Sequence, residues 1–151
     1  MSTPSPYAFN HYYQTQVTTA DKREVVLYLY EGVIKYLRQA LAALEADDVP
    51  EKCQRLTQAM DIIMELACML DFEQGGEIAV RLNSLYTFAL QSLLEANTKK
   101  TFEEARKPIG HCLEIITTIR DGWVQILKFT QASTAPQLPE EAAGGRKRFI
   151  G

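Results

Sequence analysis

Apolar residues recur at alternating steps of four and three along most of this chain, and that spacing constrains the fold more than any other feature. An α-helix brings residues spaced in this way to one side, so each such run predicts an amphipathic helix. The chain shows no sustained apolar–polar alternation and no hairpin dipeptide between apolar runs, so no strand pattern competes. We call the apolar residues of one such run a seam. The first seam consists of Val26, Tyr30, Val33, Leu37, Ala40 and Leu44.

Three further runs repeat this spacing, and breaks separate them. Asp47 and Asp48 end the first helix, and Pro50 fits the first position of the second, where its missing N–H costs nothing. The double glycine Gly75-Gly76 is the strongest break in the chain. The three seams are Cys53, Leu56, Met60, Ile63, Ala67 and Leu70, then Ile78, Leu82, Leu85, Ala89 and Leu93, and finally Ile109, Cys112, Ile116, Ile119, Trp123 and Ile126.

Capping signals set the expected helix starts. Asp21 with Glu24, and Thr101 with Glu104, each fit a capping box. Pro108 then interrupts the last run. Either residues 102–106 form a separate turn and Pro108 opens the fourth helix, or one helix kinks there, and we favour the first interpretation.

These patterns predict an all-α protein, an antiparallel up-down four-helix bundle over residues 21–130. The third helix is expected from about Gly76 to Asn97, and the fourth is expected to end near Phe129 or Thr130. Residues 1–20 are expected to form an extended aromatic N-terminal arm, because two prolines precede several large rings. Residues 131–151 lose periodicity and are expected to form a mobile C-terminal tail.

Charge and cysteine content narrow the class of protein. The 151 residues carry 16 Lys+Arg and 19 Asp+Glu, a net charge of −3, which disfavours broad electrostatic binding to nucleic acid. Three cysteines without a CxxC pair indicate free thiols in a reducing cytosol. We expect no signal peptide, because the N-terminus has neither a basic start nor an apolar run. We expect no direct membrane insertion, because no stretch approaches about 18 consecutive apolar residues.

The sequence offers no catalytic or cofactor-binding constellation, so we expect no enzyme, no cofactor and no metal. A di-iron bundle needs a Glu-x-x-His motif on each of two helices, whereas this chain has only His11 and His111, the latter with Glu114 in reverse order. Cys112 adjoins His111, but helix neighbours do not share a face. The broad apolar arc of the third helix instead suits recognition of a partner helix.

Seven short motifs follow one another in order over residues 10–128. They are Tyr12–Ala20 (YYQTQVTTA), Leu29–Gly32 (LYEG), Gln58–Ile63 (QAMDII), Leu70–Ala79 (LDFEQGGEIA), Leu82–Tyr86 (LNSLY), Leu93–Asn97 (LLEAN) and Arg120–Trp123 (RDGW). In their spacing and order, rather than in any single motif, the chain resembles the FliS family of flagellin export chaperones. Glu31 stands where the family usually has aspartate.

The resemblance implies a cytosolic chaperone that binds the C-terminal segment of flagellin, prevents premature polymerisation and delivers it to the membrane export gate. It also implies that the aromatic arm, with Tyr12, covers part of the client site when that site is empty. The resemblance implies Tyr12 as one flagellin-binding residue. From the pattern of the second and third helices we place the others at Ile62, Leu66, Asn83, Tyr86, Leu90, Leu94 and Asn97. Two alternatives are a ferritin-like metal-binding bundle and a bundle whose exposed stripe drives self-association.

Overall fold

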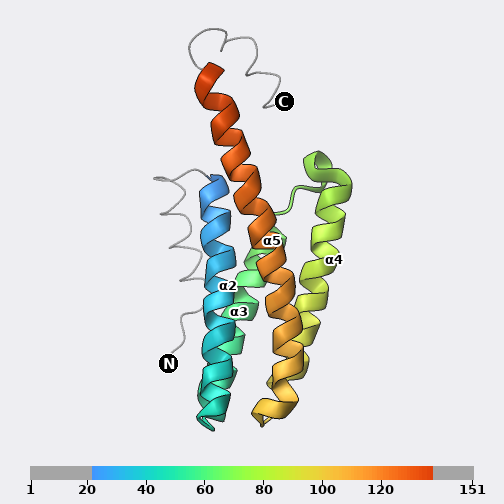
Figure 1. Cartoon of the computed structure of the whole chain (residues 1–151). Coiled ribbons are helices and arrows are strands. Elements are labelled where there is room, and N and C mark those ends of the chain that lie inside the picture. Colours follow the sequence, from blue (N-terminus) through green and yellow to red (C-terminus); the bar gives the residue numbers. More distant parts are fainter. Residues whose placement is uncertain (1–21, 138–151) are drawn as a thin grey trace.

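The computed structural model describes residues 22–137, with side chains described to Lys128. Its helices are α2 (Lys22–Glu45), α3 (Val49–Cys68), α4 (Phe72–Asn97) and α5 (Phe102–Gln137), with no strand in this range. Successive helices run in opposite directions through short connections (Figure 1). The predicted all-α up-down four-helix bundle is therefore confirmed, whereas the expected arm over 1–20, the Asp21 cap and residues 138–151 lie outside the described range.

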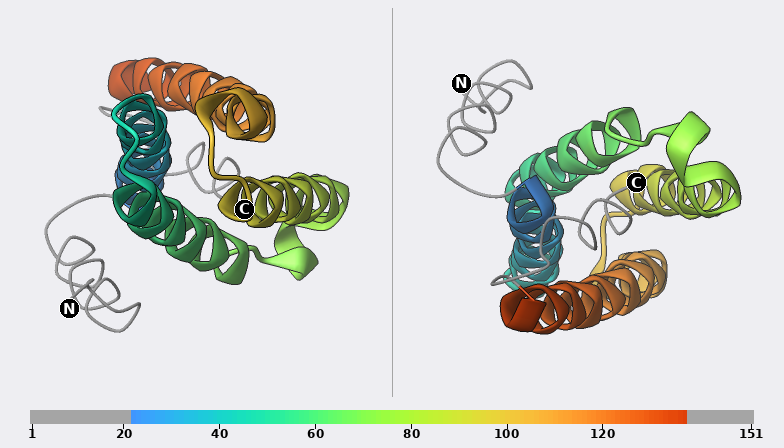
Figure 2. Two further views of the ribbon diagram at one scale, coloured as in Figure 1. Left: turned by 90° about the horizontal axis from the view of Figure 1, so that it is seen from below. Right: turned by 90° about the horizontal axis from the view of Figure 1, so that it is seen from above.

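Each helix packs against two neighbours around one core. α2 contacts α3 and α5, and α4 contacts the same two helices from the opposite side (Figure 2). The first seam is confirmed, because all its members are buried except Val26, which is half-buried. Of the last seam, Ile109, Cys112 and Ile116 are buried, whereas Ile126 is half exposed.

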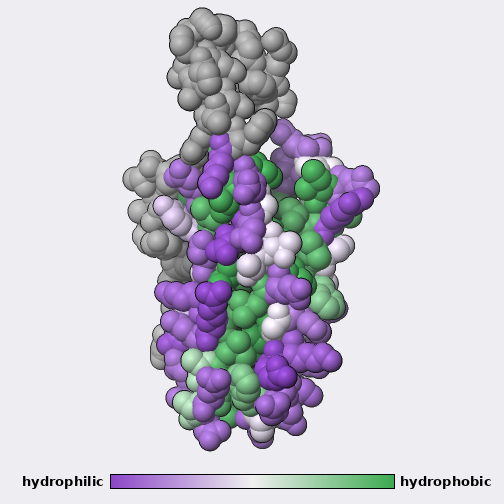
Figure 3. All heavy atoms as spheres, in the orientation of Figure 1, coloured by the Kyte–Doolittle hydropathy of each residue, from purple (hydrophilic) through white to green (hydrophobic). Residues whose placement is uncertain are grey.

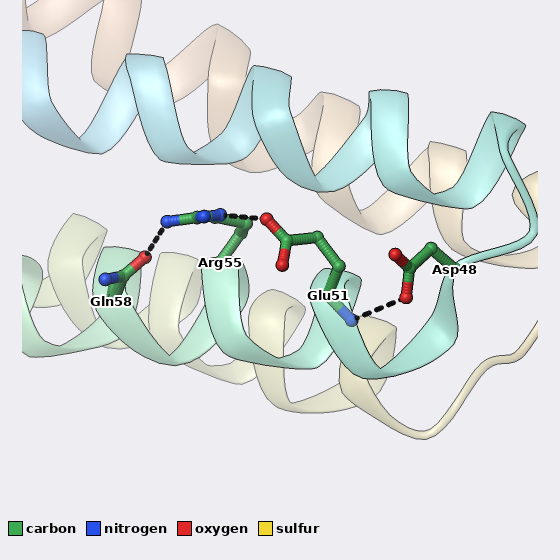
Figure 4. A network of polar contacts seen from close by, with 4 residues as sticks. All are labelled: Asp48, Glu51, Arg55 and Gln58. Carbon is green, nitrogen blue, oxygen red and sulfur yellow. Dashed lines mark hydrogen bonds and ion pairs between the residues drawn. The ribbon is translucent and has the colours of Figure 1, made fainter. Parts of the chain in front are cut away.

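The start of α3 shows how local chemistry sets a helix end. Asp48 is the N-cap, and its carboxylate accepts a hydrogen bond from the Glu51 amide at 3.1 Å (Figure 4). Pro50 is the second helical residue rather than the predicted first, since the helix begins at Val49. Arg55 then bonds Glu51 at 2.6 Å and Gln58 at 2.8 Å along the same helix.

Lys52, in the first turn of α3, joins this helix to the end of α4. Its side chain is 0% exposed, and its ammonium group donates to the carbonyls of Ala96, Asn97 and Lys99 at 3.2, 3.2 and 2.7 Å. The last carbonyls of a helix lack partners within it, and a cation there also interacts favourably with the helix dipole. Lys52 thus caps α4 from a neighbouring helix.

The double glycine falls inside α4 rather than before it. A single turn begins at Phe72, capped by Asp71, whose carboxylate accepts from the amides of Glu73 and Gln74 at 3.1 Å each. The helix then kinks at Gly76, with φ of 50° and ψ of −127°. Only glycine adopts this region at little cost. The predicted break is confirmed, but the helix starts earlier than expected.

The predicted seam of α4 is wrong in two places. Ile78 is 70% exposed and Leu85 is also exposed, although both were expected in the core. The apolar arc of α4 is wider than the face that α3 and α5 cover, so periodicity alone cannot locate its centre. The buried residues of α4 are Ala79, Tyr86, Ala89, Ser92, Leu93 and Ala96.

The favoured interpretation of Pro108 is also wrong. Thr101 accepts a hydrogen bond from the Glu104 amide at 3.2 Å, as its capping signal predicts, and one helix runs from Phe102 through Pro108. Ala105 and Ile109 on either side of the proline are fully buried, so core packing holds the helix together there. The helix continues to Gln137 rather than ending near residue 130, so residues 131–137 are helical.

Burial of Cys112 predicts a measurable pH dependence of stability. Burial raises the pKa of its thiol from 9.0 to about 12, so between these values the unfolded chain loses a proton that the folded chain keeps. The free energy of unfolding should therefore fall as pH rises above 9, by up to about 1.4 kcal/mol per pH unit from this group. Urea unfolding between pH 8 and 10 measures this slope. It should be shallower in Cys112→Ala and unchanged in Cys68→Ala, which alters an exposed thiol; equal slopes in both would contradict the assignment.

Candidate functional site

An apolar cavity of about 220 Å³ opens where α2 begins, α3 ends and α4 kinks. It is smaller than the roughly 300–1,000 Å³ of typical small-molecule sites, so it suits one or two side chains of a bound peptide. Almost all of its wall is hydrocarbon. Its lining residues are Val26, Tyr30, Leu66, Met69, Leu70, Asp71, Gly75, Ile78, Ala79, Leu82, Tyr86 and Trp123.

Two tyrosines from opposite helices meet in the wall of this cavity. The hydroxyl groups of Tyr30 on α2 and Tyr86 on α4 lie 2.6 Å apart and form a buried hydrogen bond. Burial raises the pKa of both phenols above the usual 10, and the neighbouring phenol raises the pKa of Tyr86 further. Both phenols therefore keep their protons across the physiological pH range.

Polar contacts between α2 and α5 hold the wall of the cavity that Trp123 forms. The indole N–H of Trp123 donates to the carbonyl of Arg23 at 2.7 Å. Arg120 pairs with Glu31 at 3.0 Å and with Asp121 at 2.8 Å. The Leu29–Gly32 and Arg120–Trp123 motifs thus contact each other, although they are far apart in the sequence. The glutamate at position 31 makes the ion pair that joins them.

From the cavity wall, a row of exposed apolar side chains continues along α4 beside α5. We call Ile78, Leu85 and Phe88 the α4 ridge; all three are exposed, and their spacing of seven and three places them on one side of the helix. Ile78 also lines the cavity, and Phe88 lines a second hollow against α5. Figure 3 shows apolar side chains gathered on the upper part of α4 beside α5.

The second hollow, of about 370 Å³, lies at the other end of the ridge. It is more polar than the cavity. Its residues are Phe88, Gln91, Ser92, Glu95, Lys107, Pro108 and His111. The ridge therefore connects an apolar end with a polar end, which suits a long segment better than a compact ligand.

The sequence-predicted site residues fall into three groups. Tyr12 lies outside the described residues. Ile62, Leu66 and Tyr86 are almost fully buried, although the last two reach the cavity wall. Ile62 packs against α2, where a Cβ at Gly32 would lie 3.1 Å from its side chain.

The remaining predicted residues share the other flank of α4. Asn83 and Leu94 are exposed, and Leu90 and Asn97 are half-buried. Their spacing places them away from the α4 ridge. The Asn97 side-chain oxygen is buried without a hydrogen-bond partner among the described residues. The structure therefore does not bring all predicted residues into one site, and their flagellin contacts stay predictions.

Sequence reasoning missed most of the cavity. Leu70 and Ile78 were assigned to apolar seams and Met69 was given no role, yet all three line the opening. The sequence feature that could have indicated the cavity is that α4 carries more large apolar residues than one helical face can hold. That excess shows that some apolar surface of α4 stays uncovered, but it does not show on which side.

Neither a metal centre nor a membrane span is present within residues 22–137. No three side chains of His, Cys, Asp or Glu in that range lie close enough together to hold a metal ion. The ferritin-like alternative therefore has no ligand set there. Among these helices, none combines the length and apolarity needed to cross a membrane.

Comparison with known proteins identifies the family. The model of the family described as flagellar protein FliS matches residues 5–130. The chain belongs to the FliS family. It is 35% identical to the flagellar secretion chaperone FliS of Vibrio cholerae, over 74% of this chain and 79% of that protein. It is 31% identical to the Bacillus subtilis chaperone of the same name, over 85% of this chain and 90% of that protein. The FliS chaperone of Salmonella typhimurium is 32% identical, over 75% and 82%.

Membership confirms the resemblance that the motifs predicted. FliS is a family of flagellar secretion chaperones rather than of enzymes. The match covers all of α2, α3 and α4 and most of α5. The apolar cavity and the α4 ridge therefore lie within the part of the chain that the family shares.

Proposed function

We propose that this FliS family member is a cytosolic chaperone for flagellin, which binds the C-terminal segment of its client. By covering that segment it prevents premature polymerisation, and it delivers the client to the export gate at the membrane. The observation that carries the proposal is uncovered apolar surface, the cavity and the α4 ridge, in a chain from a family of secretion chaperones.

The shape of this surface suits a client that must be held and then released. A peptide helix presents anchors at i, i+3, i+4 and i+7, which can lie along the ridge with one side chain in the cavity. Folding of a disordered segment onto a partner buries on the order of 1,000–3,000 Å² and loses about 2–5 kcal/mol to ordering. A long shallow surface spreads the binding energy over many weak contacts, so the client can leave stepwise.

Binding to intact and truncated flagellin tests the proposal. Purified chain mixed with full-length flagellin should give a one-to-one complex by size-exclusion chromatography with light scattering. Flagellin lacking its C-terminal segment should give no complex, because the apolar anchors are then absent. Equal binding of both forms would contradict the proposed client segment, and light scattering of the chain alone tests the self-association alternative.

A further inference from the structure

Among the described residues, four polar side chains line the apolar cavity, and two of them are bonded to the backbone. The Trp123 N–H donates to the Arg23 carbonyl, and the Asp71 carboxylate caps α4 by accepting from two amides. The remaining polar side chains of the lining are Tyr30 and Tyr86, which are 3% and 2% exposed. Within the described part of the chain each bonds to the other alone.

A count of protons shows that this pair has one donor left over. Each phenol carries one O–H proton, and the bond between the two oxygens uses only one of them. The second proton therefore has no acceptor among the described residues. An unpaired buried donor is rarer and less well tolerated than an under-used carbonyl oxygen.

We infer that the Tyr30–Tyr86 pair donates its spare O–H to a main-chain carbonyl of the client segment seated in the cavity. The inference rests on the proposed function and adds to it a polar anchor within an otherwise apolar surface. A client that enters in a partly helical form exposes the carbonyls of its last turn, which lack partners within the helix. A phenol donor in the wall satisfies one of them whatever the side chain, so it fixes the depth and direction of the segment without demanding a sequence.

Either hydroxyl of the pair can supply the donor, and this property makes the inference testable by a double-mutant cycle. In Tyr86→Phe the Tyr30 hydroxyl stays and loses its only partner, so its proton becomes fully available. In Tyr30→Phe the same holds for Tyr86. Only the double variant removes every donor and leaves a client carbonyl unpaired in a hydrocarbon wall.

The expected result is a strongly non-additive pattern in the affinity for full-length flagellin, measured by isothermal titration calorimetry. At least one single variant should bind within about threefold of the unchanged chain, whereas the double variant should bind roughly tenfold more weakly or worse. Tyr28→Phe removes a hydroxyl from an exposed position on the same helix and serves as the matched control. It should leave the affinity unchanged.

Thermal unfolding separates this binding effect from an effect on folding. The single variants should melt lower than the double variant, because each leaves one buried hydroxyl without a partner while the double variant leaves none. A double variant that binds as tightly as the unchanged chain would overturn the inference, and so would two single variants that are both as weak as the double. If the unchanged chain binds no flagellin at all, the proposed function fails, and the inference falls with it.

Discussion

Replacing Ile78 by aspartate is expected to weaken flagellin binding by roughly 30-fold or more while leaving the bundle folded. Ile78 is 70% exposed, lines the apolar cavity and begins the α4 ridge, so little of the core depends on it. Burying a side chain of this size contributes about 1.5–3 kcal/mol, and a carboxylate placed against the same apolar contact must also lose water. Titration calorimetry with full-length flagellin measures the change.

Val80→Asp provides the matched control for that experiment. Val80 is 53% exposed, lies two residues further along α4 and does not line the cavity. The same charge on the same helix should therefore change the affinity little. Equal losses in both variants would show that a negative charge anywhere on α4 is the cause. An unchanged affinity in Ile78→Asp would place the client elsewhere on the bundle.

A second large effect is expected on the stability of the bundle, at Lys52, which lies far from the cavity. Lys52→Met is expected to lower the free energy of unfolding by about 3 kcal/mol, because two carbonyls at the end of α4 and the Lys99 carbonyl just beyond it lose a charged donor that methionine cannot replace. The methionine retains most of the apolar stem, so the loss of packing is small. Urea denaturation monitored by circular dichroism gives the value.

Lys100→Met separates the capping of α4 by Lys52 from a general effect of removing a positive charge. Lys100 is exposed and lies near the same end of α4, so its replacement should change stability by less than about 0.5 kcal/mol. If Lys52→Met is as mild as Lys100→Met, water satisfies the carbonyls and the buried ammonium is not needed.

The parts of the fold that periodicity predicted well are those where one apolar stripe matches one covered face. On α2 the predicted seam from Tyr30 to Leu44 is buried throughout. On α4 the stripe is too broad, and Ile78 and Leu85 were assigned to the core although they are exposed. The missing information is where α3 and α5 stop covering α4. That depends on the whole bundle rather than on the segment itself.

Long-range polar contacts were beyond sequence reasoning for a similar reason. The Tyr30–Tyr86 bond joins residues 56 positions apart, and the Arg120–Glu31 pair joins residues 89 positions apart. Taken alone, each of these residues is of a type that is common at surface or core positions, so nothing in the sequence marks its distant partner. Pro108 illustrates the opposite error, since a strong local signal for a helix start was overridden by the burial of Ala105 and Ile109 around it.

The kink at Gly76 has a stereochemical consequence for the entrance of the cavity. Its backbone occupies a region that mirror-image residues adopt readily, and a Cβ there would meet nothing within 4 Å. An L-amino acid at position 76 is therefore disfavoured by the backbone conformation and not by lack of room. At Gly75 the room itself is short, because a Cβ would lie 3.0 Å from that of Ala79. Glycine is the one achiral amino acid among the twenty that are encoded. Almost any substitution of Gly76 would therefore strain the backbone of the turn beside the cavity opening.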